Sequence, residues 1–356
     1  MLTRVIVLSV CVLAAACGGS STPTSPSTSS GSSAPTNFVI ATQQVTMTSN
    51  VVGFTWSGSG STYKMIIGSA AGASDILSVD VTGTSYTWTG PRTAGIYYAR
   101  VAATTSGTVG SASTELPVFT LDMRNMIDAL FFGYGPMSDA GSNGPASSAA
   151  VWADGATINT LVTTEAGAAS LTAAQTFVQD YLAATSNFIS APISTTTTGY
   201  GGVSLFAIPL DTVVVRVDRT ICPQSGVIAC AYYGPLPYGP GRSFVNLNAA
   251  PTGNTPDSWR AIAHEIGHAY GLHHLSQSAS ARVEFRFLMN PTLVADQLSV
   301  AEKTAIAAAR QGGIRPGWTR SQAVAAGLVL ANPNASPITF FNRLDDIVPW
   351  PGGPER

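Results

Sequence analysis

Hydrophobic and polar residues alternate along short stretches within residues 37–119. Residues 52–56 alternate in this way, and Tyr63, Met65 and Ile67 fall on one side of the following stretch. Serine, glycine and threonine separate the stretches. Alternation with a period of two, broken by turn residues, is typical of half-buried strands. The pattern predicts an antiparallel β-sandwich over residues 37–119.

The pattern changes after residue 120 to a mixture of strands and helices. Short apolar runs predict strands near 156–163, 212–218 and 244–248. Helices are expected to begin near Pro256 and near Ser299, where a serine followed three residues later by glutamate forms a capping box. We therefore expect an α+β domain over residues 120–316. Residues 317–356 are expected to form a C-terminal tail, to which the pattern assigns no role.

The N-terminus has the pattern of an export signal. Arg4 precedes an apolar run that ends in three alanines at Ala16, which is too short to span a bilayer as a mature helix. Cys17 follows, and then a Ser/Thr/Pro linker that extends to residue 36. This arrangement resembles a bacterial lipobox, which implies a lipid on Cys17 and anchoring at the outer membrane or cell surface. The alternative is cleavage after Ala16 and release of a secreted chain.

Charge and cysteine content limit the partners. The chain has 17 Lys and Arg against 19 Asp and Glu, and only 10% of its residues are charged. Without a basic stripe, nucleic-acid binding is not expected. We expect a monomer whose only membrane contact is the N-terminal lipid. Cys222 and Cys230 predict a disulfide bond in an exported chain, because no second cysteine pair accompanies them as zinc ligands.

All four histidines lie within residues 264–274. In a helix that begins near Pro256, His264 and His268 lie one turn apart and project from the same face. Gly271 can adopt the left-handed conformation that ends a helix, so that the chain reverses and His274 returns toward the first two. Three imidazoles with a fourth position open to water are typical of a catalytic zinc site.

Glu265 lies about 100° around the helix from His264. It is displaced from the ligand face, but it is placed to take a proton from a zinc-activated water and to pass it to a leaving amine. His273 and Glu284 are rival third ligands. His273 is one residue short of the expected spacing, and Glu284 lacks the downstream aspartate that such a ligand would prefer. No motif indicates a calcium site.

Two families resemble parts of this chain. Trp56 on an early strand and the run at 97–103 resemble a fibronectin type III domain. The motif His-Glu-x-x-His-x-x-Gly-x-x-His at 264–274, followed by Met289 in a candidate Met-turn, resembles the metzincin zinc endopeptidases. This resemblance implies a twisted, mostly parallel sheet with one antiparallel edge strand, an active-site helix and a C-terminal helix. It also implies that Met289 forms an apolar base beneath the zinc.

The metzincin resemblance further implies where a peptide substrate binds. The strand at 244–248 would be the edge strand against which an extended peptide lies, and Thr292 and Leu293 would wall the adjoining pocket. The substrate-binding candidates are Phe244, Val245, Asn246, Leu247, Thr292 and Leu293.

The chain departs from the metzincin pattern at several positions. Leu275 follows the third histidine, no tyrosine closely follows Met289, and no cysteine lies between Cys17 and Cys222 to act as a latency switch. The matrixin-like subgroup is nearest.

The leading hypothesis is an exported zinc endopeptidase that cleaves extracellular or envelope proteins. One alternative is a surface adhesin with a structural zinc, and another is a metallohydrolase that acts on a non-peptide amide. Structural zinc sites are usually closed by four protein ligands, whereas this motif supplies three together with a glutamate.

Overall fold

The structure is a computed structural model, and it describes residues 33–138, 146, 149, 159–164, 172, 176, 193–196, 212–217, 229–233, 242–247, 256–269, 271–275, 289, 298–315 and 317–333. The predicted signal peptide, Cys17, Cys222, Thr292 and Leu293 lie outside these residues. Within the described part, no helix is both long and apolar enough to cross a membrane.

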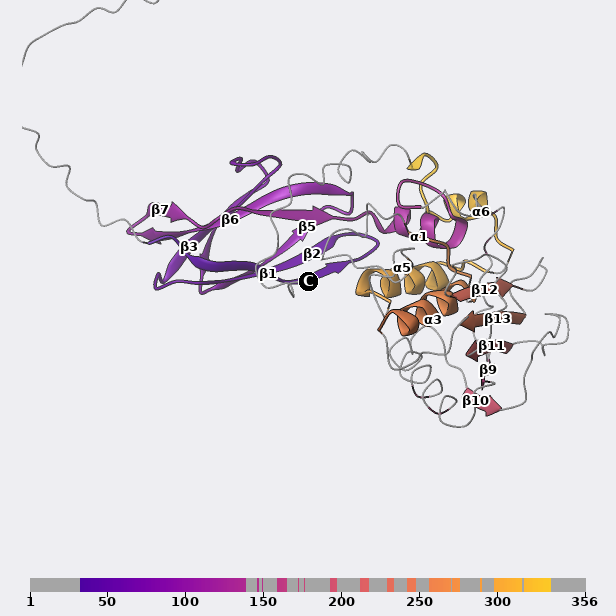
Figure 1. Cartoon of the computed structure of the whole chain (residues 1–356). Helices are drawn as coiled ribbons and strands as arrows, with labels where there is room; N and C mark the ends of the chain where they lie inside the picture. Colours follow the sequence, from indigo (N-terminus) through magenta and orange to yellow (C-terminus); the bar gives the residue numbers. More distant parts are fainter. Residues whose placement is uncertain are drawn as a thin grey trace, which may run out of the picture.

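The N-terminal half is a sandwich of two antiparallel sheets (Figure 1). The first sheet has the order β1-β2-β5, with bounds Thr36–Val45, Asn50–Ser57 and Ser85–Gly90. The second has the order β4-β3-β6-β7, with bounds Leu77–Thr82, Thr62–Gly68, Gly95–Thr105 and Thr108–Ala112. Strand β8 (Leu116–Thr120) also pairs with β6. The predicted β-sandwich is confirmed.

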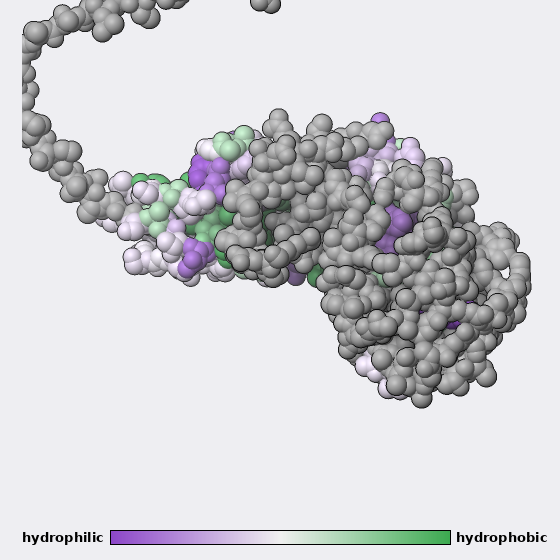
Figure 2. Space-filling view, viewed as in Figure 1, coloured by the Kyte–Doolittle hydropathy of each residue, from purple (hydrophilic) through white to green (hydrophobic). Residues whose placement is uncertain are grey.

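The alternation in the sequence corresponds to the two faces of each sheet. Tyr63, Met65 and Ile67 are fully buried on β3, whereas Lys64 points outward and pairs with Asp80 at 2.7 Å. The sandwich aromatics Phe54, Trp56 and Trp88 are buried in the same core. On the face seen in Figure 2, hydrophilic and hydrophobic residues are intermingled over the sandwich. The buried aromatic residues Phe54, Trp56 and Trp88 therefore serve packing.

The C-terminal half is built on a five-stranded mixed sheet of order β10-β9-β11-β13-β12. The bounds are Ile193–Thr196, Asn159–Thr164, Thr212–Val217, Arg242–Leu247 and Ala229–Tyr233. Neighbouring strands are parallel except β12, which is antiparallel to β13 at one edge. A mostly parallel sheet with one antiparallel edge strand was expected and is observed.

The expected identity of the edge strand is wrong. Strand β13, which contains the predicted substrate-binding residues Phe244, Val245, Asn246 and Leu247, pairs with β11 on one side and with β12 on the other. Both sides of its backbone are therefore occupied, and an extended peptide cannot add to it. Among the described strands, the outermost one on this side of the sheet is β12, a short strand that the apolar pattern did not predict.

Four helices are described in this half: α1 (Met123–Phe132), α3 (Pro256–Ala269), α5 (Val300–Gln311) and α6 (Arg320–Ala325). The predicted starts of α3 and α5 are confirmed. At α5, the Ser299 hydroxyl accepts from the Glu302 N–H at 3.1 Å and Glu302 accepts from the Ser299 N–H at 2.7 Å, which completes the capping box. Helix α3 packs against β12 and β13, and α1 packs against α5 (Figure 1).

The folded unit continues past the predicted boundary at residue 316. Trp318, Ala323 and Leu328 pack into the same core as α1, α3 and α5. The Ala149 N–H donates to the Trp318 carbonyl at 2.8 Å, and the Gly317 N–H donates to the Ala149 carbonyl at 3.0 Å. The described residues 317–333 are therefore part of this half and not a separate tail.

Candidate metal site

Helix α3 and the turn after it bring three histidines together. His264 and His268 lie one turn apart on α3 and are 3% and 8% exposed. Gly271, which has a φ of 90°, reverses the chain after the helix, as predicted. Its N–H donates to the His268 carbonyl at 2.8 Å, and the Leu272 N–H donates to the Gly267 carbonyl at 3.1 Å. This turn returns His274 to the face that carries the first two histidines.

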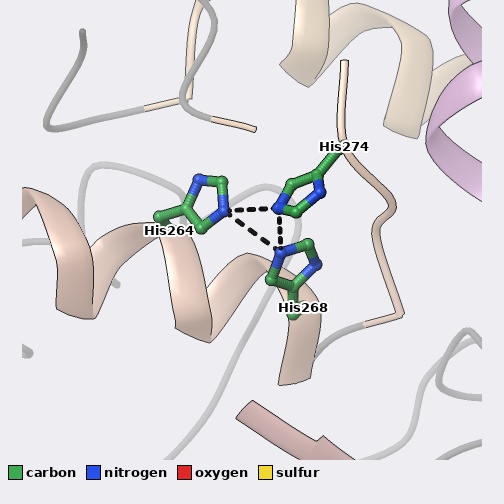
Figure 3. A group of neighbouring side chains, drawn as sticks. All are labelled: His264, His268 and His274. Atoms are coloured by element: carbon green, nitrogen blue, oxygen red, sulfur yellow. Dashed lines mark hydrogen bonds between the residues drawn. The ribbon is translucent and has the colours of Figure 1, made fainter. Parts of the chain in front are cut away.

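The three side chains converge through their Nε2 atoms (Figure 3). The Nε2 separations are 3.1 Å between His264 and His268, 3.0 Å between His264 and His274, and 2.9 Å between His268 and His274. Zinc–nitrogen bonds of about 2.0–2.1 Å in a tetrahedral site require nitrogen separations of about 3.3 Å. The observed triangle is close to that size, so the three residues can hold a metal ion.

The hydrogen bond of His268 favours the tautomer that a metal ligand needs. Its Nδ1 lies 2.6 Å from the Leu272 carbonyl oxygen, which can only accept, so Nδ1 carries the proton. The lone pair is then left on Nε2, which faces the other two histidines. Burial lowers the pKa of His268 well below its ordinary 6.5, and the neighbouring His264 and His274 lower it further. The imidazole is therefore held neutral at physiological pH.

Glu265 follows the first histidine and contacts the edge of the sheet. The Ala231 N–H, on β12, donates a hydrogen bond to its carboxylate. Burial raises the pKa of Glu265 to about 7, and the bond from Ala231 opposes this rise. A carboxyl group with a pKa near neutrality can both accept and release a proton under physiological conditions.

Met289 lies against the helix that carries two of the histidines. It is fully buried, and a Cβ placed on Gly267 would lie 2.3 Å from its Sδ. The Leu275 N–H donates to its carbonyl at 2.8 Å, and its own N–H donates to Glu302 Oε1 at 3.0 Å. The segment after His274 and the start of α5 thus hold this methionine beneath α3.

The remaining residues singled out in the sequence are the two rival ligands and the predicted disulfide, and the structure describes only some of them. His273 is half-buried beside the cluster but is not a member of it, and burial together with His274 lowers its pKa to about 4. Glu284 lies outside the described residues. Cys230, on β12, is disulfide-bonded, and its predicted partner Cys222 lies outside the described residues.

Sequence reasoning missed two groups that support the site. Ala231 acts through its backbone N–H, which no side-chain motif can reveal. Glu302 was recognised as a capping residue, but its second bond, to the Met289 N–H, joins positions 13 residues apart. Such a bond depends on tertiary packing. The only available signal was a glutamate at the start of an otherwise apolar helix face.

Solved structures provide matches for the sandwich. They include the chicken CNTN1 FN1–FN3 domains, at 17% identity and a TM-score of 0.21, covering 25% of this chain and 31% of that one. The fibronectin type III domain of human fibronectin type III domain containing protein 3 matches at 19% identity and a TM-score of 0.23, covering 33% and 97%. The FN5 domain of Drosophila Lar matches at 18% identity and a TM-score of 0.21, covering 25% and 97%. No family model and no curated protein matches the chain.

Proposed function

We propose that this protein is a zinc-dependent endopeptidase of metzincin-like design. The observation that carries the proposal is the convergence of three histidine Nε2 atoms, 2.9–3.1 Å apart, next to a glutamate that is not itself part of the cluster. The N-terminal signal pattern and Cys17 support export and lipid anchoring, so the substrates we propose are extracellular or envelope proteins.

Each residue has a distinct role in this proposal. His264, His268 and His274 hold the ion, and the Leu272 carbonyl orients His268. A bound zinc ion would supply the Lewis acidity that activates a water molecule and polarises the substrate carbonyl. The Glu265 carboxylate accepts a proton from the attacking water and then donates it to the leaving amine nitrogen. The Ala231 N–H holds that carboxylate in position.

The outer edge of β12 is the surface that we propose for the peptide. In an antiparallel ladder, every second residue turns its N–H and C=O away from its partner strand. The Ala231 N–H donates to the Glu265 carboxylate, so by this alternation the Ala231 carbonyl and the backbone groups of Ala229 and Tyr233 would be offered on the outer side of β12. An extended peptide that pairs there would lie beside the proposed proton-transfer group.

Two other functions start from the same three histidines. A surface adhesin with a structural zinc would have no use for Glu265 beside the cluster, and structural sites usually have four protein ligands. A hydrolase of non-peptide amides would use the same residues. The position of β12 as the outermost described strand next to Glu265 favours a peptide, because only a peptide has repeating backbone groups that match a strand.

The test is hydrolysis of a quenched-peptide library by the chain beginning at Ser20. We expect endopeptidase activity that disappears on chelation and returns with zinc. We also expect Glu265→Gln to lose at least about 100-fold in activity, as for removal of a general base, while it still binds one zinc ion. Lys64→Gln, on the sandwich, is the control. Zinc binding without cleavage by the unmodified chain would contradict the proposal and favour the adhesin.

A further inference from the structure

Helix α1 is buried on all sides. Nine of its ten residues are buried, including the polar Asn125 and Asp128. An ordinary surface helix has an exposed polar face, whereas a helix buried all round lies between packed elements. Figure 1 shows α1 where the sandwich meets the C-terminal half, and it packs against α5. It is therefore the central element of the junction.

The N-terminal end of α1 is held by the sandwich through Asn50. This residue begins β2 and is fully buried. Its Nδ2 donates to the Pro91 carbonyl at 2.7 Å and to the Leu121 carbonyl at 2.9 Å, and its Oδ1 accepts from the Leu121 N–H at 3.0 Å. Leu121 immediately precedes Asp122, whose side chain caps α1. One amide group thus binds both backbone groups of the residue that joins the two halves.

The two halves also share one apolar core. Val45 of β1 and Phe119 of β8 are buried in the same cluster as residues of α1, α3 and α5, and Met47 and Ile96 pack against this cluster. Strand β1 also contacts α5. A module on a flexible tether would keep a polar surface at this end. Here the end of the sandwich contributes apolar side chains to the core of its neighbour.

The C-terminal end of α1 contacts the segment that carries the third histidine. The Leu130 carbonyl accepts a hydrogen bond from the His273 N–H at 2.8 Å, one residue before His274. Asp128 pairs with Arg320 at 2.7 Å, which fixes the same helix to α6. A continuous series of buried contacts therefore runs from Asn50 through α1 to the histidine cluster.

We propose that the β-sandwich is a permanently docked partner of the metal-binding half, and that Asn50 is the positioning residue that couples them through α1. The two halves then unfold as one cooperative unit. The sandwich in turn supports the segment that carries His274. This inference uses the histidine cluster of the proposed function, but it does not depend on peptide hydrolysis.

The test measures whether destabilising one half destabilises the other in the full chain. Ile266→Ala removes a buried side chain from α3, far along the chain from the sandwich. Temperature-dependent hydrogen exchange would follow amides of β6 and of α3 separately. We expect Ile266→Ala to lower the unfolding temperature of both by the same number of degrees, with no metal added. A fall in α3 alone would overturn the proposal.

The role of Asn50 is tested by Asn50→Asp, which preserves its size but removes the two N–H donors. In this background we expect Ile266→Ala to lower the unfolding temperature of β6 by fewer degrees than that of α3. We also expect weaker zinc binding by Asn50→Asp, whereas Gln44→Ala, at an exposed site on β1, should match the unmodified chain. Equal effects on β6 with and without Asn50→Asp would show that this residue does not couple the halves. The exchange measurement needs no zinc. Its result can therefore be interpreted even if the protein proves not to be a zinc endopeptidase.

Discussion

Met289 packs so closely on Gly267 that any side chain at that helix position would force the methionine to move. A Cβ on Gly267 would lie 2.3 Å from the Met289 Sδ and 3.2 Å from its Cε. Gly267 lies between His264 and His268 in sequence, so the methionine supports the turn of α3 that carries both of them. The glycine in the His-Glu-x-x-His segment therefore has a packing role that the motif itself does not require.

Gly267→Ala should therefore destabilise the protein, although alanine is the better helix former. Overpacking costs roughly 1–3 kcal/mol, and the helix preference for alanine returns about 1 kcal/mol, so we expect a net loss of up to about 2 kcal/mol. Combining it with Met289→Ala should cost less than the sum of the two single changes, because the second change removes the clash. Denaturant unfolding of the four proteins measures this. Strict additivity would mean that the two residues do not interact.

Glu302 should matter more than an ordinary capping residue. Glu302→Ala leaves the buried Met289 N–H without its acceptor, which costs roughly 1–3 kcal/mol beyond the loss of the cap. Gln322→Ala is the matched control, since Gln322 occupies the same capping-box position on α6 but is exposed. Its cost should be at most about 1 kcal/mol. Equal losses of unfolding free energy would argue against a supporting role for the bond to Met289.

The two adjacent histidines should differ sharply in zinc binding. Loss of a partner that only orients a ligand weakens metal binding by about 10–100-fold, so loss of a ligand in His274→Ala should exceed that. His273→Ala should stay within a few-fold of the unmodified chain, because its side chain is not part of the cluster. Competition with a chromophoric chelator measures both constants. The reverse order would make His273 the third ligand.

Zinc should also stabilise the folded chain. A ligand that binds only the native state at 100 times its dissociation constant adds about 2.7 kcal/mol. We expect this gain in the unmodified chain and its near absence in His274→Ala, as measured by denaturant unfolding with and without zinc. A similar gain in both proteins would place the bound zinc elsewhere.

The ion pair between Asp128 and Arg320 should contribute much more than the pair on the sandwich. The Asp128 side chain is fully buried, and both of its oxygens accept from Arg320 at 2.7–3.1 Å. Removing one partner of a buried pair costs roughly 3–5 kcal/mol, which we expect for Asp128→Asn. Asp80→Asn breaks the pair between Lys64 and the 72% exposed Asp80, and should cost at most about 1 kcal/mol. Comparable losses of unfolding free energy in urea would show that burial does not determine how much each ion pair contributes to stability.

Local signals in the sequence predicted the features that depend on neighbours along the chain. The spacing of His264 and His268, the reversal at Gly271 and the capping box at Ser299 each follow from helix geometry within a few residues. The alternation at Tyr63, Met65 and Ile67 likewise predicted the buried face of a strand.

Features that depend on distant contacts were not predictable in this way. The position of β12, and not β13, at the edge of the sheet could not be predicted, because strand pairing joins residues far apart in sequence. Helix α1 is another case: Asn125 and Asp128 share one of its faces and are nevertheless buried, which depends on contacts with elements distant in sequence such as α5 and α6. The boundary predicted at residue 316 is also wrong because the contacts that attach the following residues, such as those of Gly317 and Trp318 with Ala149, join positions far apart in sequence.

That boundary has a practical consequence for anyone who expresses the metal-binding half as a recombinant fragment. A chain that stops at residue 316 would lack Arg320 and would leave the buried Asp128 carboxylate without its cation. It would also uncover the apolar surface that Trp318, Ala323 and Leu328 cover in the intact protein. Such a fragment should accumulate in inclusion bodies, and soluble material should require an end point no earlier than residue 333.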